Sequence, residues 1–398
     1  MQHFNAEGEK LSLKSVQPRG FYFSSQERTI IGNGLRHFIS IPAQGGEELH
    51  SELQKEISRC FKKEIERGVD NPILIGCIPF DVSAPSCLYV PENVTSYSNR
   101  PDLNNEPNVL GSINDFGVVS KRSKPNESSF KEAVDKAVGK FKSTELEKAV
   151  LSRVLEIELN SDVDVEQILT RLIKQNPKGF HFSIPQPDRS VLVGASPELL
   201  IRKEGGSIYS NPLAGSAKRQ SNKQQDKITS EKLQGSVKDN YEHRLVIDQI
   251  ATQLSPYCQT LHVPQQPSLF DTPTMWHLAT SIEGELKDAQ TNALQLACLL
   301  HPTPAVCGYP FNLSHDAIKE LEPHDRGMFT GMVGWCDAQG NGEWAVTIRC
   351  GKVRDNSVRL FAGAGIVDAS CPNAEWAETE AKLGTMLDAF GLKEQEVA

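Results

Sequence analysis

The sequence predicts an α+β fold. Strand-like and helix-like stretches are mixed along its 398 residues in no strict strand–helix–strand order, which favours α+β sheets over a doubly wound parallel sheet. No internal repeat is present, and a chain of this length holds either two ordinary domains or one large domain. Either arrangement buries a substantial core, so core size sets no constraint on the fold.

Residues 1–95 predict a first portion built from strands and one helix. Apolar and β-branched runs predict three strands, and one amphipathic stretch predicts a helix. The strands are expected at 20–25, 28–35 and 72–80, and the helix at 49–66. The stretch 96–117 that follows is rich in Asn, Pro, Gly and Ser, which is typical of a linker.

Residues 118–398 predict a second, larger portion. An amphipathic pattern predicts a helix at 128–143, and a long helix is expected at 228–254. Apolar or alternating runs predict strands at 148–159, 191–196, 199–206, 343–353 and 358–365.

Composition excludes several classes of function. The formal net charge of −9 argues against sequence-independent nucleic-acid binding, which needs a basic face. The N-terminus lacks the apolar core of a signal peptide, and no run of about 18 apolar residues occurs, so we expect a cytoplasmic protein without a membrane span. Nine scattered cysteines with no C-x-x-C pair indicate neither a zinc site nor a disulfide framework.

Lys148 begins the alternating strand at 148–159 and shares one face with Val150, Ser152 and Val154. A lysine buried on a sheet can have its pKa lowered by desolvation and act as a general base. The alternative is a strand-end lysine that keeps its ammonium in water.

Glu198 follows Ser196 and Pro197 at the end of an apolar strand. An apolar pocket there would keep the carboxyl protonated, as a general acid requires. The alternative is an acidic residue in the first turn of a helix that Ser196 caps.

Arg349 lies within the strand expected at 343–353, on one face with Ala345 and Thr347. A guanidinium beside small residues is costly unless it meets an anion, and its planar fork fits a carboxylate. The position therefore predicts an anion-binding arginine.

Acidic residues on two expected helices predict a site for a hard cation. Glu242 lies on the helix at 228–254, whereas Glu375, Glu378 and Lys382 share one face of a later helix. Oxygen ligands without a His or Cys cluster are what Mg²⁺ prefers. The alternative for each residue is a surface Glu–Lys pair.

Two glycine-containing segments predict close approach of the backbone to a ligand. Around Gly215 and Ser216, backbone N–H groups and a hydroxyl offer a nest for a carboxylate. Gly363 and Gly365 follow an apolar run and predict a turn. A dinucleotide fingerprint is disfavoured there, because Asp368 stands where its third glycine belongs.

Taken in order, the motifs resemble those of the chorismate-binding enzymes, which include isochorismate, anthranilate, aminodeoxychorismate and salicylate synthases. The matching segments are EKAVLSRVLEI, GASPELLIR, NPLAGSAKR, DNYEHRLVIDQI, HLATSIEGEL, LLHPTPAVCGYP, DRGMFTGMVGW, TIRC and FAGAGIVDASCPNAEWAETEAKL. They cover nearly everything from Lys131 onward, and GFYFSS and IGCIPFD resemble the family's first segment.

This resemblance implies one large domain, residues 1–398, of two facing antiparallel β-sheets with helices packed outside. It also implies an Mg²⁺-dependent chorismate site between the sheets. By motif, the metal ligands correspond to Glu242 and Glu378, with Glu375 as a further candidate. The positions that hold the substrate correspond to Ala214, Gly215, Ser216, His277, Arg349, Gly363 and Lys382. A structural histidine is the alternative for His277.

Two positions narrow the resemblance to one member. Family members that add water to the ring have the lysine of EKAVLSR, here Lys148, whereas those that add ammonia lack it. Aminodeoxychorismate synthases carry a nucleophilic lysine where this chain has Ala214. The expected reaction is attack of water at ring C2 with loss of the C4 hydroxyl, with Lys148 as base and Glu198 as acid, which makes isochorismate.

Three alternatives stay open. A salicylate synthase would also eliminate pyruvate, although Val306 resembles the aliphatic residue of synthases that stop at isochorismate. A menaquinone-pathway enzyme would make the same product, but the chain length resembles the synthases that supply 2,3-dihydroxybenzoate for siderophores. An inactive chorismate-binding regulator is disfavoured because the acid, base and metal positions are intact. The pathway also makes association with downstream enzymes an expectation.

Overall fold

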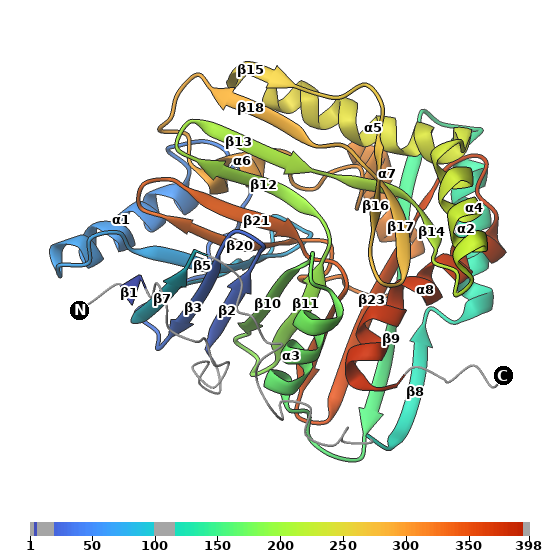
Figure 1. The fold of residues 1–398 in the computed structure, drawn as a ribbon, viewed down its shortest axis with the longest axis horizontal. Coiled ribbons are helices and arrows are strands. Elements are labelled where there is room, and N and C mark those ends of the chain that lie inside the picture. The colour runs from blue at the N-terminus through green and yellow to red at the C-terminus, as the bar shows by residue number, and fades with distance from the viewer. Residues whose placement is uncertain (1–3, 6–19, 99–115, 393–398) are drawn as a thin grey trace.

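Two large β-sheets pack face to face and hold a shared apolar core between them (Figure 1). The computed structural model describes residues 4–5, 20–98 and 116–392. The shared core contains Phe23 and Phe182 from one sheet and Ile75 and Trp335 from the other. Strands from residues 1–95 and from residues 118–398 enter both sheets.

The first large sheet has eleven strands. In spatial order they are β1 (Phe4–Asn5), β7 (Asn93–Tyr97), β3 (Thr29–Asn33), β2 (Phe21–Ser24), β10 (Phe180–Pro185), β11 (Val191–Ser196), β22 (Cys350–Arg354), β23 (Ser357–Ile366), β9 (Lys148–Leu159) and β19 (Gly308–Tyr309), with β8 (Val118–Lys124) also paired to β9. Only the β1–β7 pair is parallel among the described strands of this sheet.

The second large sheet has nine antiparallel strands. Their order is β15 (Cys258–His262), β18 (Ile282–Leu286), β13 (Ser207–Asn211), β12 (Leu199–Glu204), β21 (Gly342–Val346), β20 (Met332–Asp337), β5 (Ile73–Ile78), β6 (Cys87–Val90) and β4 (His37–Ile39). A small third sheet, which the sequence analysis did not anticipate, contains β14 (Leu213–Lys218), β17 (Met275–Ala279) and β16 (Ser268–Asp271).

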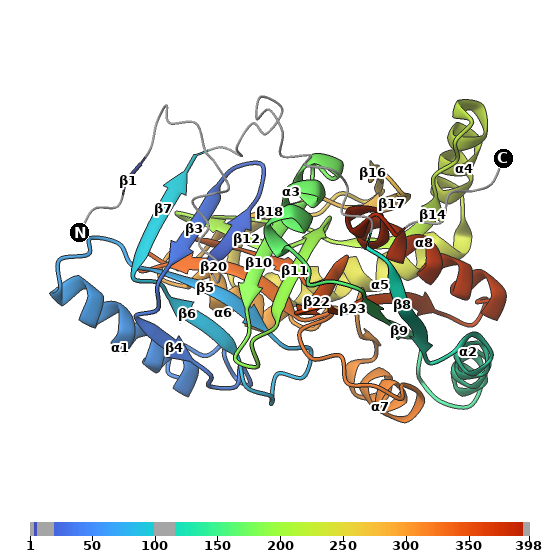
Figure 2. The ribbon, with the colours of Figure 1, turned by 90° about the horizontal axis from the view of Figure 1, so that it is seen from below.

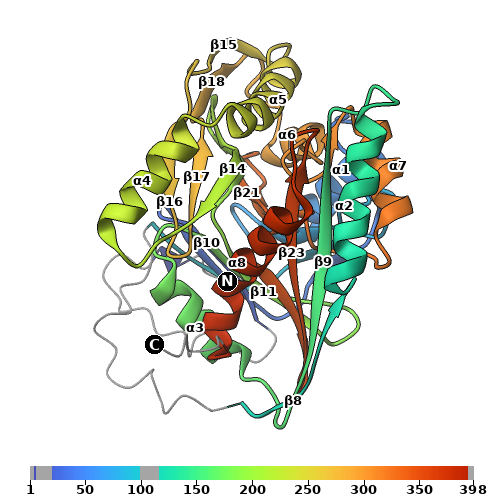
Figure 3. The same cartoon turned by 90° about the vertical axis from the view of Figure 1, so that its right-hand side faces the viewer.

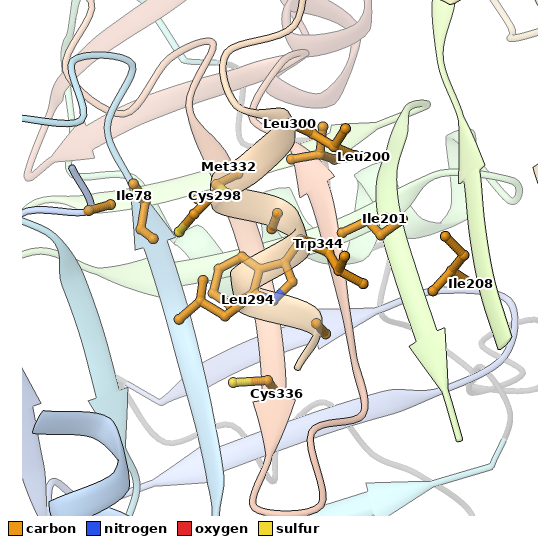
Figure 4. Packing of buried hydrophobic residues seen from close by; sticks show 14 of the residues in the cluster. Ile78, Leu200, Ile201, Ile208, Leu294, Cys298, Leu300, Met332, Cys336 and Trp344 are labelled. Carbon is orange, nitrogen blue, oxygen red and sulfur yellow. The ribbon is translucent and has the colours of Figure 1, made fainter. Parts of the chain in front are cut away.

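Eight described helices cover the outer faces and edges of the sheets. They are α1 (Glu52–Glu66), α2 (Glu127–Phe141), α3 (Val165–Gln175), α4 (Lys223–Gln234), α5 (Val237–Leu254), α6 (Ala293–Leu300), α7 (Phe311–Leu321) and α8 (Pro372–Phe390). Helices α1, α5 and α6 pack on the nine-stranded sheet, and Figure 4 shows Leu294 of α6 beside Trp344 of β21. Helices α3 and α8 pack on the eleven-stranded sheet, and α2 and α7 lie beside β9 (Figures 2 and 3).

Most expected elements are confirmed, including two facing sheets with helices outside. The strand at 148–159 coincides with β9, because its strict alternation is a local signal. The helices expected at 49–66 and 128–143 correspond to α1 and α2. The segment 96–117 lies mostly outside the described residues, and its first two residues belong to β7.

Two expected elements are wrong. The long helix at 228–254 is two helices, because α4 ends at Gly235 and Ser236 caps α5 by accepting the Asp239 N–H at 3.2 Å. The strand at 343–353 is also two strands, since β21 belongs to the nine-stranded sheet and β22 to the eleven-stranded sheet.

Eight of the nine cysteines are buried, as expected for small core residues, and only Cys371 is exposed. None of them forms a disulfide. No helix in the described ranges has the length and apolar character needed to cross a membrane.

Candidate functional site

A cavity lies where two segments of chain cross from one large sheet to the other. The first crossover joins β11 to β12 through Pro197 and Glu198, and the second joins β21 to β22 through residues 347–349. The cavity is lined by Val150, Pro197, Glu198, Leu213, Ala214, Gly215, Ser216, Glu242, His277, Ala305, Val306, Phe329, Thr330, Ile348, Arg349, Phe361, Ala362, Gly363, Gly365 and Lys382. Nine of the twelve predicted site residues therefore line one cavity, whereas Lys148, Glu375 and Glu378 are not part of its lining.

Hydrogen bonds tie the two crossovers to each other. The Val346 N–H donates to the carbonyl of Glu198 at 3.1 Å, and the Ala195 N–H donates to the carbonyl of Arg349 at 3.0 Å. The backbones that carry the Glu198 and Arg349 side chains are thus fixed relative to one another by strand pairing that continues through the change of sheet.

Arg349 occupies the second crossover and does not lie within a strand, which corrects the sequence prediction. Its φ of 49° is in the left-handed region, an uncommon conformation for a residue with a side chain. Such strain costs about 1–3 kcal/mol and is concentrated at functional sites. Its side chain is buried without an acceptor in the described part of the chain, and burial lowers its pKa to about 10. An unpaired buried guanidinium is suited to an anionic ligand.

Glu198 is a buried acid between two strands, and no helix begins at this point. One of its carboxyl oxygens accepts the Leu213 N–H at 3.4 Å. Burial raises its pKa to about 7, against the opposing effects of that N–H and of the charges on Lys148, Lys382 and Arg349. Near neutral pH the group can therefore exist as an acid with a proton to give.

Lys148 is fully buried at the start of β9, which rules out a lysine with its ammonium in water. Its Nζ lies 3.0 Å from Oε1 of Glu242 on α5. The absence of a side chain at Gly365 allows this contact, since a Cβ there would lie 2.1 Å from the same oxygen. Backbone, carboxylate and ammonium therefore pack together without intervening side chains.

The two predicted metal residues of α8, Glu375 and Glu378, are each paired with a lysine. Oε1 of Glu378 lies 2.6 Å from Nζ of Lys382 and accepts from the Ser216 hydroxyl at 3.4 Å. The Glu375 carboxylate lies 2.7 Å from Nζ of Lys238, a partner that the sequence analysis did not identify. Each predicted metal residue thus has a cation beside it, including Glu242 with Lys148.

Negative charge is nevertheless crowded between α5 and α8. Burial raises the pKa of Asp239, and Glu242 and Glu378 act in the same direction. Burial also raises the pKa of Glu375, with Glu378 adding to it. The described residues contain no group of three His, Cys, Asp or Glu side chains already arranged around a metal position. An all-oxygen, electron-rich donor set still fits a hard divalent cation that would relieve this repulsion.

The strand β14 brings Ala214, Gly215 and Ser216 to the cavity wall. Its pairing with β17 is irregular between Ala214 and Ser216, and Gly215 has a φ of 78°. A residue in such a bulge has an unpaired backbone, which is consistent with the predicted nest. Opposite Ser216, the buried His277 ring has no hydrogen-bond partner at Nε2 among the described residues. Burial, Arg349 and Lys382 all lower the His277 pKa, so its imidazole is neutral.

The glycine-rich segment 362–365 is not a turn. It lies inside β23, where Gly363 pairs with Ser152 and Gly365 with Val150. The strand expected at 358–365 is confirmed, whereas the turn expected at its glycines was wrong, because glycine is more often found in turns than in a central strand. Lys382 donates to the Gly363 carbonyl at 2.8 Å, which ties α8 to this strand.

Most of the apolar wall of the cavity was not predicted from the sequence. Phe329, Ile348 and Phe361 line the cavity, and Thr330 beside them has a φ of 58°. In sequence these residues resemble ordinary core positions, so no local signal distinguishes them. Val306, which was singled out, does lie in the wall.

The chain is similar to known proteins over most of its length. Residues 92–391 match the family model described as "Chorismate binding enzyme". The isochorismate synthase EntC of Escherichia coli (strain K12) is 44% identical over 387 residues, 97% of this chain and 98% of that protein. The isochorismate synthase DhbC of Bacillus subtilis (strain 168) is 38% identical, with 96% of each chain covered.

The chain also resembles solved structures. A putative 2,3-dihydroxybenzoate-specific isochorismate synthase, DhbC from Bacillus anthracis, superimposes with a TM-score of 0.89 at 38% identity, covering 96% of this chain and 98% of that one. Anthranilate synthase component I from Streptococcus pneumoniae TIGR4 has a TM-score of 0.71 at 19% identity, over 90% of this chain and 92% of that one, and shares the fold.

The raised pKa of Glu198 predicts a pH-dependent effect of Glu198→Gln on stability. Below the ordinary pKa of 4.5 the Glu198 carboxyl is neutral in both the folded and the unfolded chain. Between pH 4.5 and about 7 it ionises in the unfolded chain but not in the folded one, so the folded protein loses stability as the pH rises. Glutamine does not ionise. Urea unfolding should therefore show similar stability at pH 5 and a variant more stable by up to about 3 kcal/mol at pH 8. A pH-independent difference between the two proteins would contradict the buried acid.

Proposed function

The chain belongs to the family of chorismate-binding enzymes, and we propose from this premise that it is an isochorismate synthase, an isomerase that converts chorismate into isochorismate. One observation carries the proposal: a buried acid, Glu198, and the buried Arg349, for which the described residues offer no acceptor, border one cavity. The fully buried Lys148 pairs at 3.0 Å with Glu242 of the cavity wall. These are the groups needed to deprotonate water, protonate a leaving hydroxyl and bind a carboxylate.

The reaction divides between Lys148 and Glu198. In its unprotonated form, Lys148 takes a proton from water as the water oxygen bonds to ring C2. The ring double bond shifts, and the C4–O bond breaks as Glu198 gives its proton to the departing hydroxyl, which leaves as water. One water is consumed and one released, so the product is an isomer of the substrate. The Glu198 pKa of about 7 supports its role as the acid.

The remaining residues would hold the substrate. Chorismate is a dianion, and the chain around it has a net charge of −9, so local cations must attract it. Arg349 would bind one carboxylate, and Lys382, together with the Gly215 bulge, would bind the other. Neutral His277 could then donate to or accept from the substrate without adding charge.

We propose Mg²⁺ as the cofactor, held by Glu242 and Glu378 with Glu375 as a further ligand. The crowded carboxylates of α5 and α8 support this choice, because a divalent cation offsets their repulsion. When bound, Mg²⁺ would supply positive charge to a substrate carboxylate. Ligation would also require Glu242 and Glu378 to loosen their ion pairs with Lys148 and Lys382.

We further propose that the product supplies 2,3-dihydroxybenzoate for siderophores. Support comes from the names of the relatives, among them a vibriobactin-specific isochorismate synthase of Vibrio cholerae and the 2,3-dihydroxybenzoate-specific enzyme of Bacillus anthracis. Association with downstream enzymes is part of this proposal.

Purified protein with chorismate and Mg²⁺ should yield isochorismate without pyruvate, as resolved by chromatography. Lys148→Ala should lose about 10²–10⁴-fold in kcat because the general base is gone. Lys142→Ala, at an exposed position after α2, is the matched control and should keep full activity. Salicylate with stoichiometric pyruvate would support a salicylate synthase, and no turnover would contradict the enzyme assignment. A fully active Lys148→Ala would refute the assigned base.

Glu378→Gln should weaken Mg²⁺ binding by at least about tenfold, because one carboxylate ligand is lost. Calorimetric titration with Mg²⁺ measures this directly, without turnover. Glu380→Gln is the control on the same helix, since Glu380 pairs with Arg153 on its other side. Equal Mg²⁺ affinity in the wild type and Glu378→Gln would remove Glu378 from the metal site.

A further inference from the structure

A second cavity of about 340 Å³ adjoins the candidate site, and Pro197 and Arg349 line both cavities. Its lining includes residues 174–179, which end α3 and follow it, residues 270–273, which end β16 and follow it, and Thr385 of α8. These segments come from three separate parts of the chain and meet around Arg349. The proposed mechanism assigns no role to this second cavity.

The second cavity is lined by more basic than acidic side chains. Lys174, Lys178 and Arg219 line it together with Arg349, whereas Asp271 is the one acidic residue in its lining. Lys178 pairs with Asp271 at 2.6 Å, whereas Arg219 pairs with Asp226 outside the cavity lining at 2.8 Å and with Asp271 at 3.6 Å. Lys174 has no ion-pair partner in the described ranges.

The same cavity also has an apolar wall, formed by Phe270, Pro177 and Pro273. Basic groups above apolar surface suit a small ring that carries carboxylates. By contrast, a surface made only of lysines would not distinguish such a ligand from any other anion.

We propose that this second cavity is an entry vestibule, in which a cyclic dicarboxylate dwells before it reaches Arg349. The inference rests on the proposed function. Glu198 and Arg349 are only 2% and 6% exposed, so a ligand must reach them through a passage. A basic passage would concentrate a dianion near a protein whose net charge repels it. Arg349, which borders both cavities, would then receive the carboxylate at the inner end.

Charge reversal tests the vestibule. The double variant Lys174→Glu/Lys178→Glu should lower kcat/KM for chorismate roughly three- to tenfold at low salt, from Coulomb's law over about 10 Å in water. The kcat should be unchanged, and the difference should shrink at high salt. Lys55→Glu/Lys62→Glu, which alters two exposed lysines of α1 by the same charge, should stay within about twofold of wild type. Equal losses in both double variants, or no loss in the first, would overturn the proposal.

A bulky label at the cavity wall distinguishes a passage that the ligand must cross from an electrostatic attraction that acts at a distance. In a Cys371→Ser background, which removes the only exposed cysteine, Gln175→Cys at the vestibule wall would be labelled with a bulky neutral maleimide. The label should lower kcat/KM at least about fivefold at any salt concentration, because it fills the passage. The same label at Ser58→Cys on α1 should have no effect. An unimpaired labelled Gln175→Cys would contradict the vestibule.

Failure of the proposed function would be distinguishable from failure of the vestibule. If wild-type protein binds chorismate without converting it, calorimetric affinities of the charge-reversal variants give the same comparison without turnover. Weaker, salt-dependent binding only in Lys174→Glu/Lys178→Glu would support the vestibule, and equal binding in all variants would overturn it.

Discussion

The pairing of two strand crossovers is the constraint on which the site depends. The hydrogen bonds from Val346 to Glu198 and from Ala195 to Arg349 hold both segments where the chain leaves one large sheet for the other. Because each crossover has strands on both sides, neither can shift without breaking pairs in two sheets. An acid and a guanidinium are thereby kept at fixed positions in the interior, where solvent would otherwise weaken their action on a ligand.

Two sets of ionisable side chains surround the crossovers. In the cavity, burial raises the pKa of Glu198 to about 7 and keeps His277 neutral, and no described side chain accepts a hydrogen bond from Arg349. Between α5, α8 and β9, Lys148 pairs with Glu242 and Lys382 pairs with Glu378, the two carboxylates that we propose hold the metal ion. The strained backbone of Arg349 is consistent with selection for ligand binding over stability. A protein of net negative charge can in this way bind a dianion.

Local patterns predicted the elements that depend on local physics. The alternation of apolar and polar residues predicted the strand at 148–159. Lys148 and Arg349 were recognised as unusual because they are charged residues among apolar or small ones. The split of 343–353 into strands of different sheets could not be predicted, because an apolar run pairs equally well with either sheet until its partners are known. For the same reason Phe329 resembled a core residue, and the partner of Glu375, Lys238, had no sequence signal. Family resemblance supplied the roles that spacing alone left open.

The most direct test of this account is the origin of the new hydroxyl oxygen. Turnover of chorismate in ¹⁸O-labelled water, followed by mass spectrometry of isochorismate at low conversion, reports whether water attacks the ring. The account predicts one ¹⁸O atom, in the hydroxyl at C2, because in the proposed mechanism Lys148 activates solvent water while Glu198 protonates the departing C4 hydroxyl. Isochorismate that retains only ¹⁶O would show that the original hydroxyl migrates within the substrate, and would contradict the assigned roles of both residues.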